Sequence, residues 1–429
     1  TTLFRSQKKV LSEIFNDFSS GYVMNRLVQG DVGCGKTAVA MIAAYLIINN
    51  GYQAVMMAPT DVLANQHYES FKAVFEPLGI SCQLLTSGLK KKEKNLAYEN
   101  IENGNAKMII GTHALIQEKV VYNNLGLVIT DEQHRFGVRQ REMLAQKGEE
   151  PHVLVMTATP IPRTLALILY GDLDISTINE LPPGRQKVDT FAVNHTYDNR
   201  LYAFIEKETA KGRQCYIICP MIEENEKLDL RSVLKFTEEL QNDRLPSLRV
   251  ECMHGKLKNN EKQDIMDRFS NGEIDVLVST TVIEVGVNVP NATLMIIENA
   301  ERFGLSALHQ LRGRVGRGGE KSYCVLVTDS KTKVAKERMT IMCKSNDGFV
   351  ISEKDLHLRG PGDFFGTRQH GLPEMKIANL YKDINILKDV QSVAIDLYKS
   401  DENLEKKENL LLKKRIEELY SEENKKICL

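Results

Sequence analysis

The sequence has almost no excess of charge of either sign, because 56 lysine and arginine residues are balanced by 57 aspartate and glutamate residues. A formal net charge of −1 argues against a protein that coats nucleic acid along its whole surface by electrostatic attraction. Basic patches can still form locally. Any contact with nucleic acid is therefore expected to involve only a limited part of the surface.

Cysteines with metal-binding or redox spacing are also lacking. The eight cysteines are scattered, with no C-x-x-C pair and no cysteine–histidine cluster of zinc spacing. Such a distribution is typical of reduced thiols in a cytosolic protein. A structural zinc site and a disulfide framework are therefore not expected.

Long hydrophobic runs and targeting signals are missing as well. The longest apolar stretches, such as residues 39–48, are too short to span a bilayer, and no basic-plus-apolar segment begins the chain. We therefore predict no membrane association and no secretion. The sequence begins with Thr1 rather than methionine, which is compatible with a fragment that lacks an N-terminal domain.

What the sequence does contain is an alternation of short apolar, β-rich runs with longer amphipathic segments, which predicts parallel α/β sheets. Its 429 residues are enough for two or three domains. The runs form two sets, the first at residues 24–28, 54–58, 108–110, 127–130 and 153–156, and the second at 214–219, 249–253, 276–279, 294–297 and 323–327.

Two changes of pattern suggest the domain boundaries. Two adjacent prolines within residues 181–185 interrupt any regular element, so we place a linker there. Beyond Lys344 the pattern changes to polar loops rich in glycine, followed by a charged helix over residues 404–423. The sequence thus predicts a first domain over residues 1–184, a second over 185–343, and a small C-terminal extension of helix and loop over 344–429.

A phosphate-binding loop is the strongest local motif. Residues 30–37 fit the pattern G-x-x-x-x-G-K-[ST] and lie between an expected strand and an expected helix over residues 38–48. Glycines let backbone N–H groups surround phosphate oxygens, and the helix N-terminus adds a favourable dipole. We expect the lysine to reach the β- and γ-phosphates of ATP and the threonine hydroxyl to bind Mg²⁺. The nucleotide-binding candidates are Gly30, Asp31, Gly33, Cys34, Gly35, Lys36 and Thr37.

Two adjacent carboxylates follow the expected strand at residues 127–130. Ligand sites of open α/β sheets lie at the carboxyl ends of the strands, where Asp131 and Glu132 are expected. Asp131 can hold Mg²⁺, and Glu132 can orient or deprotonate the attacking water. An Asp-Glu pair after a strand is a weak signal alone, but downstream of a phosphate loop it indicates a Walker B motif.

A third component, the segment over residues 310–318, lies in the expected second domain and is rich in arginine and glycine. Phosphoryl transfer gains from an arginine aimed at the charge that develops on the γ-phosphate. Arg314 and Arg317 are the candidates. A basic solvated loop or a nucleic-acid patch would show the same composition. If they act on ATP, the cleft between the domains must close on ATP and can reopen after hydrolysis, as in a motor.

The order of these motifs resembles that of the superfamily-2 helicases over essentially the whole chain. Further segments in the same order are Ala-Pro-Thr at 58–60, Gly-Thr-His at 111–113, Thr-Ala-Thr-Pro at 157–160, Met-His-Gly at 253–255 and the segment 280–287. The resemblance implies two tandem RecA-like domains, with ATP and Mg²⁺ as cofactors. It also implies that Gln7 reads adenine and that Gly286 contributes to the nucleotide site, although the lead-in to Gln7 departs from the family pattern.

Several segments are similar to the RecG family of branched-DNA helicases in particular: residues 131–137, 161–165, 180–185 and 309–314, followed by 355–362 and 366–369. The last two resemble a translocation motif that RecG shares with the Mfd family of transcription-repair coupling translocases. Gln133 and the Leu-Pro-Pro-Gly linker favour RecG. RecG-like proteins also carry an N-terminal wedge domain that splits the branch, and no segment here resembles it.

The resemblance implies an ATP-dependent helicase or translocase that acts on branched DNA, such as replication forks and recombination junctions. It would couple ATP hydrolysis to duplex translocation and fork regression, in the cytoplasm of a bacterium, as a monomer. A single-stranded-DNA-binding protein is a candidate partner. Helicases of this kind hold nucleic acid chiefly by its phosphates. The candidate DNA contacts are Thr60, Thr112, His113, Thr280, Arg359 and Gln369.

Two other functions remain open at this point. One is an Mfd-like translocase on double-stranded DNA, and the other is a non-catalytic DNA-binding scaffold with the same fold. Intact Lys36, Asp131 and Glu132 argue against a dead site. A metabolic kinase with a phosphate loop is a poor fit, because it needs no second α/β domain that carries arginines. The core is expected to hydrolyse ATP, whereas fork-specific unwinding can depend on the wedge.

Overall fold

The computed structural model describes residues 3–131, 138–158, 173–180, 186–220, 226–280, 289–364 and 384–419. The chain divides into two compact units, one formed by Thr1–Ile161 with Asp172–Asp355 and the other by Pro162–Gly171 with Leu356–Leu429. The first unit contains both sheets. The second contains C-terminal helices.

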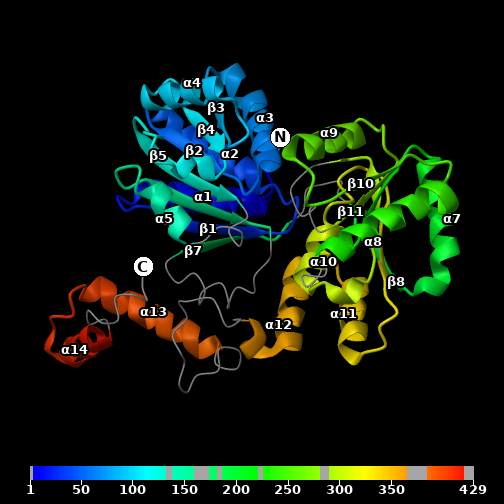
Figure 1. Cartoon of the computed structure of the whole chain (residues 1–429). Coiled ribbons are helices and arrows are strands. Elements are labelled where there is room, and N and C mark those ends of the chain that lie inside the picture. The colour runs from blue at the N-terminus through cyan, green and yellow to red at the C-terminus, as the bar shows by residue number, and fades with distance from the viewer. Residues whose placement is uncertain are drawn as a thin grey trace. The chain divides into compact units, whose positions relative to one another are not determined.

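The first sheet has seven parallel strands in the order β3-β4-β2-β5-β6-β1-β7 (Figure 1). Because all strands are parallel, their carboxyl ends share one edge of the sheet, where ligand sites of such folds lie. The strands are β1 Asn25–Gly30, β2 Gln53–Met57, β3 Cys82–Leu85, β4 Met108–Gly111, β5 Leu125–Asp131, β6 His152–Thr157 and β7 Asp174–Ile178.

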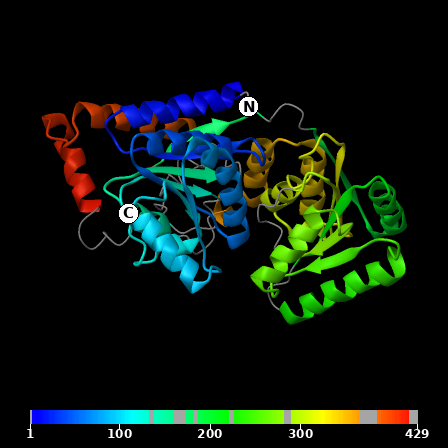
Figure 2. The ribbon, with the colours of Figure 1, turned by 90° about the horizontal axis from the view of Figure 1, so that it is seen from above.

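Helices cover both faces of this sheet, as Figure 2 shows from above. Buried apolar side chains of α1 (Arg5–Ser19), α2 (Lys36–Asn49) and α3 (Asp61–Phe75) pack with those of one face. Side chains of α4 (Lys91–Glu102) and α5 (Val138–Ala145) pack with those of the other. The central strands β2 and β5 are buried on both sides and are mostly apolar, which explains why their sequences form continuous hydrophobic runs.

Helix α1 is fixed to the sheet by buried polar groups as well as by apolar packing. The Arg26 guanidinium on β1 donates to the Asp17 carboxylate of α1 at 2.5 and 2.9 Å and to the Ser176 hydroxyl of β7 at 2.9 Å. At the other end of the helix, the Glu180 carboxylate accepts from the Ser6 backbone and hydroxyl, both at 2.8 Å. The two contacts of Glu180 with Ser6 hold the first turn of α1, which carries Gln7, in place.

The second sheet has six parallel strands in the order β10-β11-β9-β12-β13-β8. Helices α7 (Asp198–Thr209) and α8 (Glu226–Glu239) pack on one face. On the other face the Phe269 ring of α9 (Asn259–Ser270) lies 4.8 Å from that of Tyr216. The strands are β8 Val188–Val193, β9 Gln214–Ile218, β10 Val250–Met253, β11 Val276–Ser279, β12 Ala292–Ile297 and β13 Ser322–Val327. Helix α10 (Leu305–Arg312) lies between β12 and β13 in the chain, and α11 (Lys333–Lys344) follows β13.

The expected pair of parallel α/β domains is thus confirmed, and each of the ten predicted runs coincides with a strand. The sequence did not reveal β3, β7 and β8, which all lie at an edge of their sheet. The linker predicted at residues 181–185 lies outside the described residues. Within the described part of the chain, no helix is long and apolar enough to cross a membrane.

The C-terminal part is more helical than its sequence suggested. Helix α12 spans Gly348–Phe364 and includes residues that were expected to form glycine-rich loops. Helix α13 spans Ile384–Ser400. The charged helix predicted from residue 404 begins instead at Leu410, as α14 (Leu410–Leu419).

The late start of α14 has a local cause. Leu404 has a φ of +51°, which helical residues do not adopt. The Asp401 carboxylate accepts hydrogen bonds from the backbone N–H groups of Glu405 and Lys406 at 2.8 and 3.0 Å. The segment is therefore held in turns up to the short 3₁₀ helix Lys407–Asn409.

Candidate nucleotide and nucleic-acid site

The predicted phosphate loop connects β1 to α2 in a conformation that requires glycine. Gly33 and Gly35 have φ values of +73° and +84°, in the left-handed region that other residues rarely adopt. A Cβ on Gly30 would lie 2.6 Å from the Cys34 sulfur and 2.9 Å from the Ile178 carbonyl oxygen. The loop is therefore a close-fitting backbone cradle at a helix N-terminus, which suits a phosphate group.

Lys36 begins α2 and folds back over this loop. Its side chain is buried, and Nζ donates to the carbonyl oxygens of Gly30 at 2.7 Å and Asp31 at 2.9 Å. These carbonyls hold the ammonium group over the loop, and the predicted contact with phosphate stays a prediction. Thr37 follows in the first turn of α2 and is partly exposed.

Gln7, the predicted adenine contact, lies directly against the loop. Its side chain is buried, and Nε2 donates to the Cys34 carbonyl oxygen at 3.1 Å. A Cβ on Gly35 would overlap the Gln7 amide. Gln7 therefore supports the shape of the loop, and its amide nitrogen is already engaged by the chain's own backbone.

Asp131 ends β5, two strands away from β1 in the sheet, with β6 between them. Its Oδ2 lies 2.9 Å from Nε2 of His67, which comes from α3. Both side chains are largely buried, with exposed fractions of 14% and 8%. His67 was not predicted as a site residue, because nothing near it in the sequence carries a catalytic pattern. Glu132 lies outside the described residues.

The donor set at this edge fits a magnesium ion better than a transition metal. Thr37 and Asp131 offer oxygen atoms, which hard cations prefer. Among the described residues there is no cluster of three or more His, Cys, Asp or Glu side chains that could cage a metal ion. Mg²⁺ typically uses one or two protein oxygens together with water and substrate phosphates, so these two residues are sufficient candidates.

The predicted arginines follow α10 in the second sheet's domain. Arg314 is buried, and Nε of the partly exposed Arg317 donates to the Gly313 carbonyl oxygen at 3.3 Å. Both guanidinium groups lie close enough to Tyr216 on β9 to oppose the rise in its pKa that burial causes. Arg314 is thus shielded from solvent, whereas Arg317 is only partly shielded.

The phosphate loop (residues 30–37) follows a strand of the first sheet, and the arginine segment (residues 309–318) lies in the domain of the second sheet. The two segments contact each other. Oδ1 of Asp31 lies 2.6 Å from Nε2 of His309 in α10. Next to it, a Cβ on Gly313 would lie 2.8 Å from Cβ of Val32. Oδ2 of Asp31 also accepts from the backbone N–H of Gly348, the first residue of α12, at 3.4 Å. His309 was not among the predicted site residues.

The candidate DNA contacts differ in how available their side chains are. Thr60 caps α3, and its hydroxyl accepts from the Leu63 N–H at 3.3 Å. The buried Thr112 donates to the Asp61 carboxylate at 3.2 Å, whereas His113 is exposed. Thr280 is buried after β11. The sequence also missed Asp61, which ties the segments after β2 and β4 together.

Three further predicted residues cannot be placed as side chains. Arg359 lies within α12, but the structure does not describe its side chain. Gly286 and Gln369 fall outside the described residues altogether. Their predicted roles at the nucleotide and on DNA therefore stay predictions.

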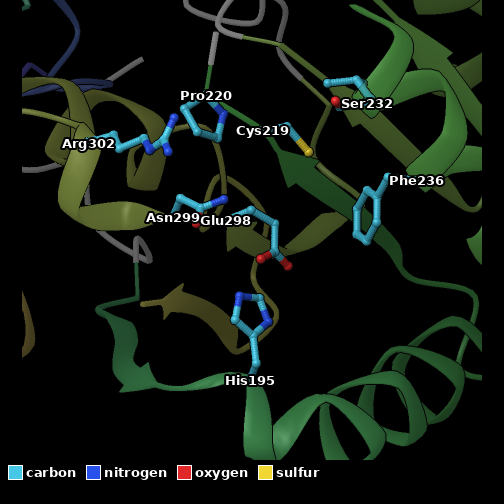
Figure 3. Close-up of a pocket in the computed structure, with 9 residues that line it drawn as sticks. His195, Cys219, Pro220, Ser232, Phe236, Glu298, Asn299 and Arg302 are labelled. Carbon is cyan, nitrogen blue, oxygen red and sulfur yellow. The ribbon is translucent and has the colours of Figure 1, made fainter. Parts of the chain in front are cut away.

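A cavity of about 310 Å³ opens at the carboxyl ends of β9 and β12, and none of the residues that line it is a predicted site residue (Figure 3). The Glu298 carboxyl group points toward the His195 ring. Burial raises the pKa of Glu298 to about 7. For His195, burial lowers the pKa, but nearby Asp198 and Glu298 outweigh it and the net shift is upward.

Comparison with known proteins shows what the chain is similar to. Residues 4–168 match the DEAD/DEAH box helicase model, 197–319 the helicase conserved C-terminal domain, and 345–426 the C-terminal part of domain 3 of the ATP-dependent DNA helicase RecG. The chain is 53% identical over 399 residues to RecG of Bacillus subtilis, covering 93% of this chain and 58% of that protein. It is 50% identical to RecG of Streptococcus pneumoniae, covering 95% of this chain and 62% of that protein.

Comparison with solved structures also gives RecG as a match. A structure of RecG bound to a three-way DNA junction matches with a TM-score of 0.75 and 45% identity, covering 90% of this chain and 50% of that one. The DEAD-box helicase Mss116 matches at 19% identity and a TM-score of 0.63, which shows the shared fold. The chain spans 58% and 62% of the two curated relatives named above. Over 93% of its length, the chain is thus similar to the ATP-dependent DNA helicase RecG.

Proposed function

We propose that this chain is the motor part of an ATP-dependent DNA helicase that acts on branched DNA. The observation that carries the proposal is the contact between the phosphate loop and the arginine segment, at Asp31–His309 and Val32–Gly313. A nucleotide held by the loop would lie next to arginines supplied by another domain. That arrangement is what ATP-driven closure of two domains requires.

The site residues have distinct proposed roles in hydrolysis. Lys36 would exchange its two carbonyl partners for the β- and γ-phosphates, and Glu132 would orient the attacking water. Arg314 and Arg317 would stabilise the charge that develops on the γ-phosphate. Thr37 and Asp131 would hold Mg²⁺, which neutralises phosphate charge when bound.

On DNA, we propose that Thr60, Thr112, His113 and Thr280 face the phosphate backbone at the carboxyl edges of the two sheets. Backbone N–H groups and hydroxyls there can bind phosphates without a large positive charge, in keeping with a net charge of −1. Arg359 and Gln369 would act in the translocation segment. The three parts 1–184, 185–343 and 344–429 would then bind ATP, supply arginines and move duplex DNA. We propose a bacterial cytoplasmic monomer, with single-stranded-DNA-binding protein as a candidate partner.

The test is the rate of ATP hydrolysis by this chain without DNA and with single-stranded DNA, plain duplex and a model fork. We expect turnover that a fork stimulates most and that Lys36→Ala abolishes, while the matched control Lys331→Ala, at an exposed position, leaves it unchanged. Stimulation by duplex without preference for a fork would favour an Mfd-like translocase over branch-specific action. DNA binding with no ATP turnover would overturn the motor and favour a scaffold.

A further inference from the structure

His309 stands at the centre of a buried polar chain that starts at the phosphate loop. Its Nε2 lies 2.6 Å from Oδ1 of Asp31, and its Nδ1 lies 3.0 Å from the Arg312 guanidinium. The exposed fractions of the His309 and Asp31 side chains are 6% and 18%, so the contact is shielded from solvent. A shielded hydrogen bond to a charged group is stronger and more directional than one at the surface.

The partners of His309 fix the direction of both hydrogen bonds. A guanidinium group has only donors, so Arg312 donates and Nδ1 of His309 accepts. The hydrogen must then be on Nε2, which donates to the Asp31 carboxylate. Asp31 in turn accepts from the neighbouring Val32 N–H at 2.6 Å, which fixes the carboxylate within the loop. The imidazole therefore bridges a cation on one side and an anion on the other.

Arg312 connects this bridge to the segment that leads into α12. Its guanidinium donates to the carbonyl oxygens of Met342 and Ser345, both at 2.8 Å, and its side chain is buried. Gly348 at the start of α12 donates to Oδ2 of Asp31, so the segment also meets the loop directly. A shift of residues 342–348 cannot leave Asp31 unaffected, because both paths end on its carboxylate.

We propose that His309 is a positioning residue that holds the phosphate loop against the arginine segment. Through Arg312, it also connects the phosphate loop to residues 342–348, which lead into α12. This inference rests on the proposed function and deepens it. His309 touches neither phosphate nor water in this role. It sets where Lys36 and the backbone cradle lie relative to Arg314 and Arg317, so its loss should slow turnover more than it weakens nucleotide binding.

The first test separates turnover from binding. For His309→Ala we expect kcat for ATP to fall by about 10- to 100-fold, the usual cost of misplacing a catalytic group by about 1 Å. The Kd of a fluorescent ATP analogue should change by less than about threefold, because the loop itself is intact. His309→Gln, whose amide can still donate to Asp31, should recover most of kcat. The matched control is His195→Gln, at an exposed histidine in the same domain.

Two results would overturn the inference: an unchanged kcat in His309→Ala, or equal losses of binding and turnover that His309→Gln does not restore. Coupling to Asp31 is checked by a double-mutant cycle. Asp31→Ala and His309→Ala together should cost little more than either alone, whereas additive losses would contradict a shared contact.

A measurement that needs no catalysis keeps this inference separate from the proposed function. Backbone amides of residues 31–37 should exchange hydrogen about 10-fold faster in His309→Ala than in the parent chain. The reason is that the loop loses the hydrogen bond from His309 to Asp31, which holds it in place. Unchanged exchange would overturn the positioning role. If the parent chain hydrolyses no ATP, the proposed function fails, but the exchange measurement still decides the role of His309.

Discussion

Nε2 of His67 lies 2.9 Å from Oδ2 of Asp131, which joins α3 to the carboxyl end of β5, where the proposed Mg²⁺-binding aspartate lies. Ionised Asp131 can only accept, so the imidazole donates from Nε2. One carboxylate oxygen is thus held by the protein. Residues that orient a metal ligand in this way tune the affinity of the ligand for its ion.

We predict that His67→Ala lowers the affinity of the nucleotide site for Mg²⁺, so that nucleotide binding needs a higher Mg²⁺ concentration. Loss of a hydrogen bond to a metal-binding carboxylate typically costs about 10- to 100-fold in metal affinity, so the half-saturating Mg²⁺ concentration should rise on that scale. Titration of Mg²⁺ against binding of a fluorescent ADP analogue measures it. His67→Gln, which keeps a donor, should lie between the two. A magnesium titration that does not change in His67→Ala would refute the prediction.

A second prediction concerns the arginines. Arg317→Ala should leave ATP binding nearly intact and slow hydrolysis by about 10³-fold or more, as expected for an arginine that acts on the transition state. Its Nε donates to the Gly313 carbonyl oxygen at 3.3 Å, and the folding of the variant is checked by its circular dichroism and its urea unfolding. The kcat and the Kd of a non-hydrolysable analogue are the quantities to compare. Equal losses of both would argue against the role in catalysis.

The sequence predicted the central strands of both sheets but only one of the four edge strands, β10. Central strands such as β2 and β5 are buried on both faces and form continuous apolar runs. The missed strands β3, β7 and β8 lie at sheet edges, and most of their positions are partly or fully exposed. An edge strand has one neighbour only, so its sequence need not be strongly hydrophobic, and pattern alone does not separate it from a loop.

Some residues of the candidate site could likewise be predicted from the sequence and others could not. The phosphate loop and Asp131 could be found because their chemistry demands fixed residue types at fixed spacing. His67 and His309 could not, because each acts through a partner that is distant in the sequence: 64 residues separate His67 from Asp131, and 278 separate His309 from Asp31. Only the folded arrangement of strands shows which histidine meets which carboxylate.

A third prediction is a pH dependence of stability at the cavity after β12. Burial disfavours the charged form of Glu298 and raises its folded-state pKa from the ordinary 4.5 to about 7. The folded state therefore binds more protons than the unfolded state between these values, and the stability due to this group is lost as pH rises through about 7. His195, whose pKa is also raised, contributes in the same direction.

Glu298→Gln removes this carboxyl group while keeping its shape. The variant should gain about 1–3 kcal/mol of unfolding free energy relative to the parent at about pH 8.5, and show almost no gain at about pH 5. Urea unfolding of both proteins at the two pH values gives the difference. A gain of the same size at both pH values would contradict the buried, neutral carboxyl group, because it would then reflect packing alone.

The fourth prediction tests the contact between the loop and the arginine segment by shape rather than by hydrogen bonding. Gly313 has a φ of −66°, which alanine adopts freely, so the backbone gives no reason for glycine. A Cβ there would meet Cβ of Val32 at 2.8 Å, closer than two carbon atoms can approach. Gly313→Ala should therefore push the phosphate loop away from the arginines and lower kcat by about 10-fold or more.

The exchange of side chains provides the control. In Gly313→Ala with Val32→Gly, the Cβ is moved from one side of the contact to the other, and kcat should recover at least in part. Val32→Gly alone measures the cost of a more flexible loop, and the recovery is judged against it. If Gly313→Ala turns over ATP at the parent rate, the two segments do not meet closely during hydrolysis, and the arginines must reach the nucleotide by another arrangement.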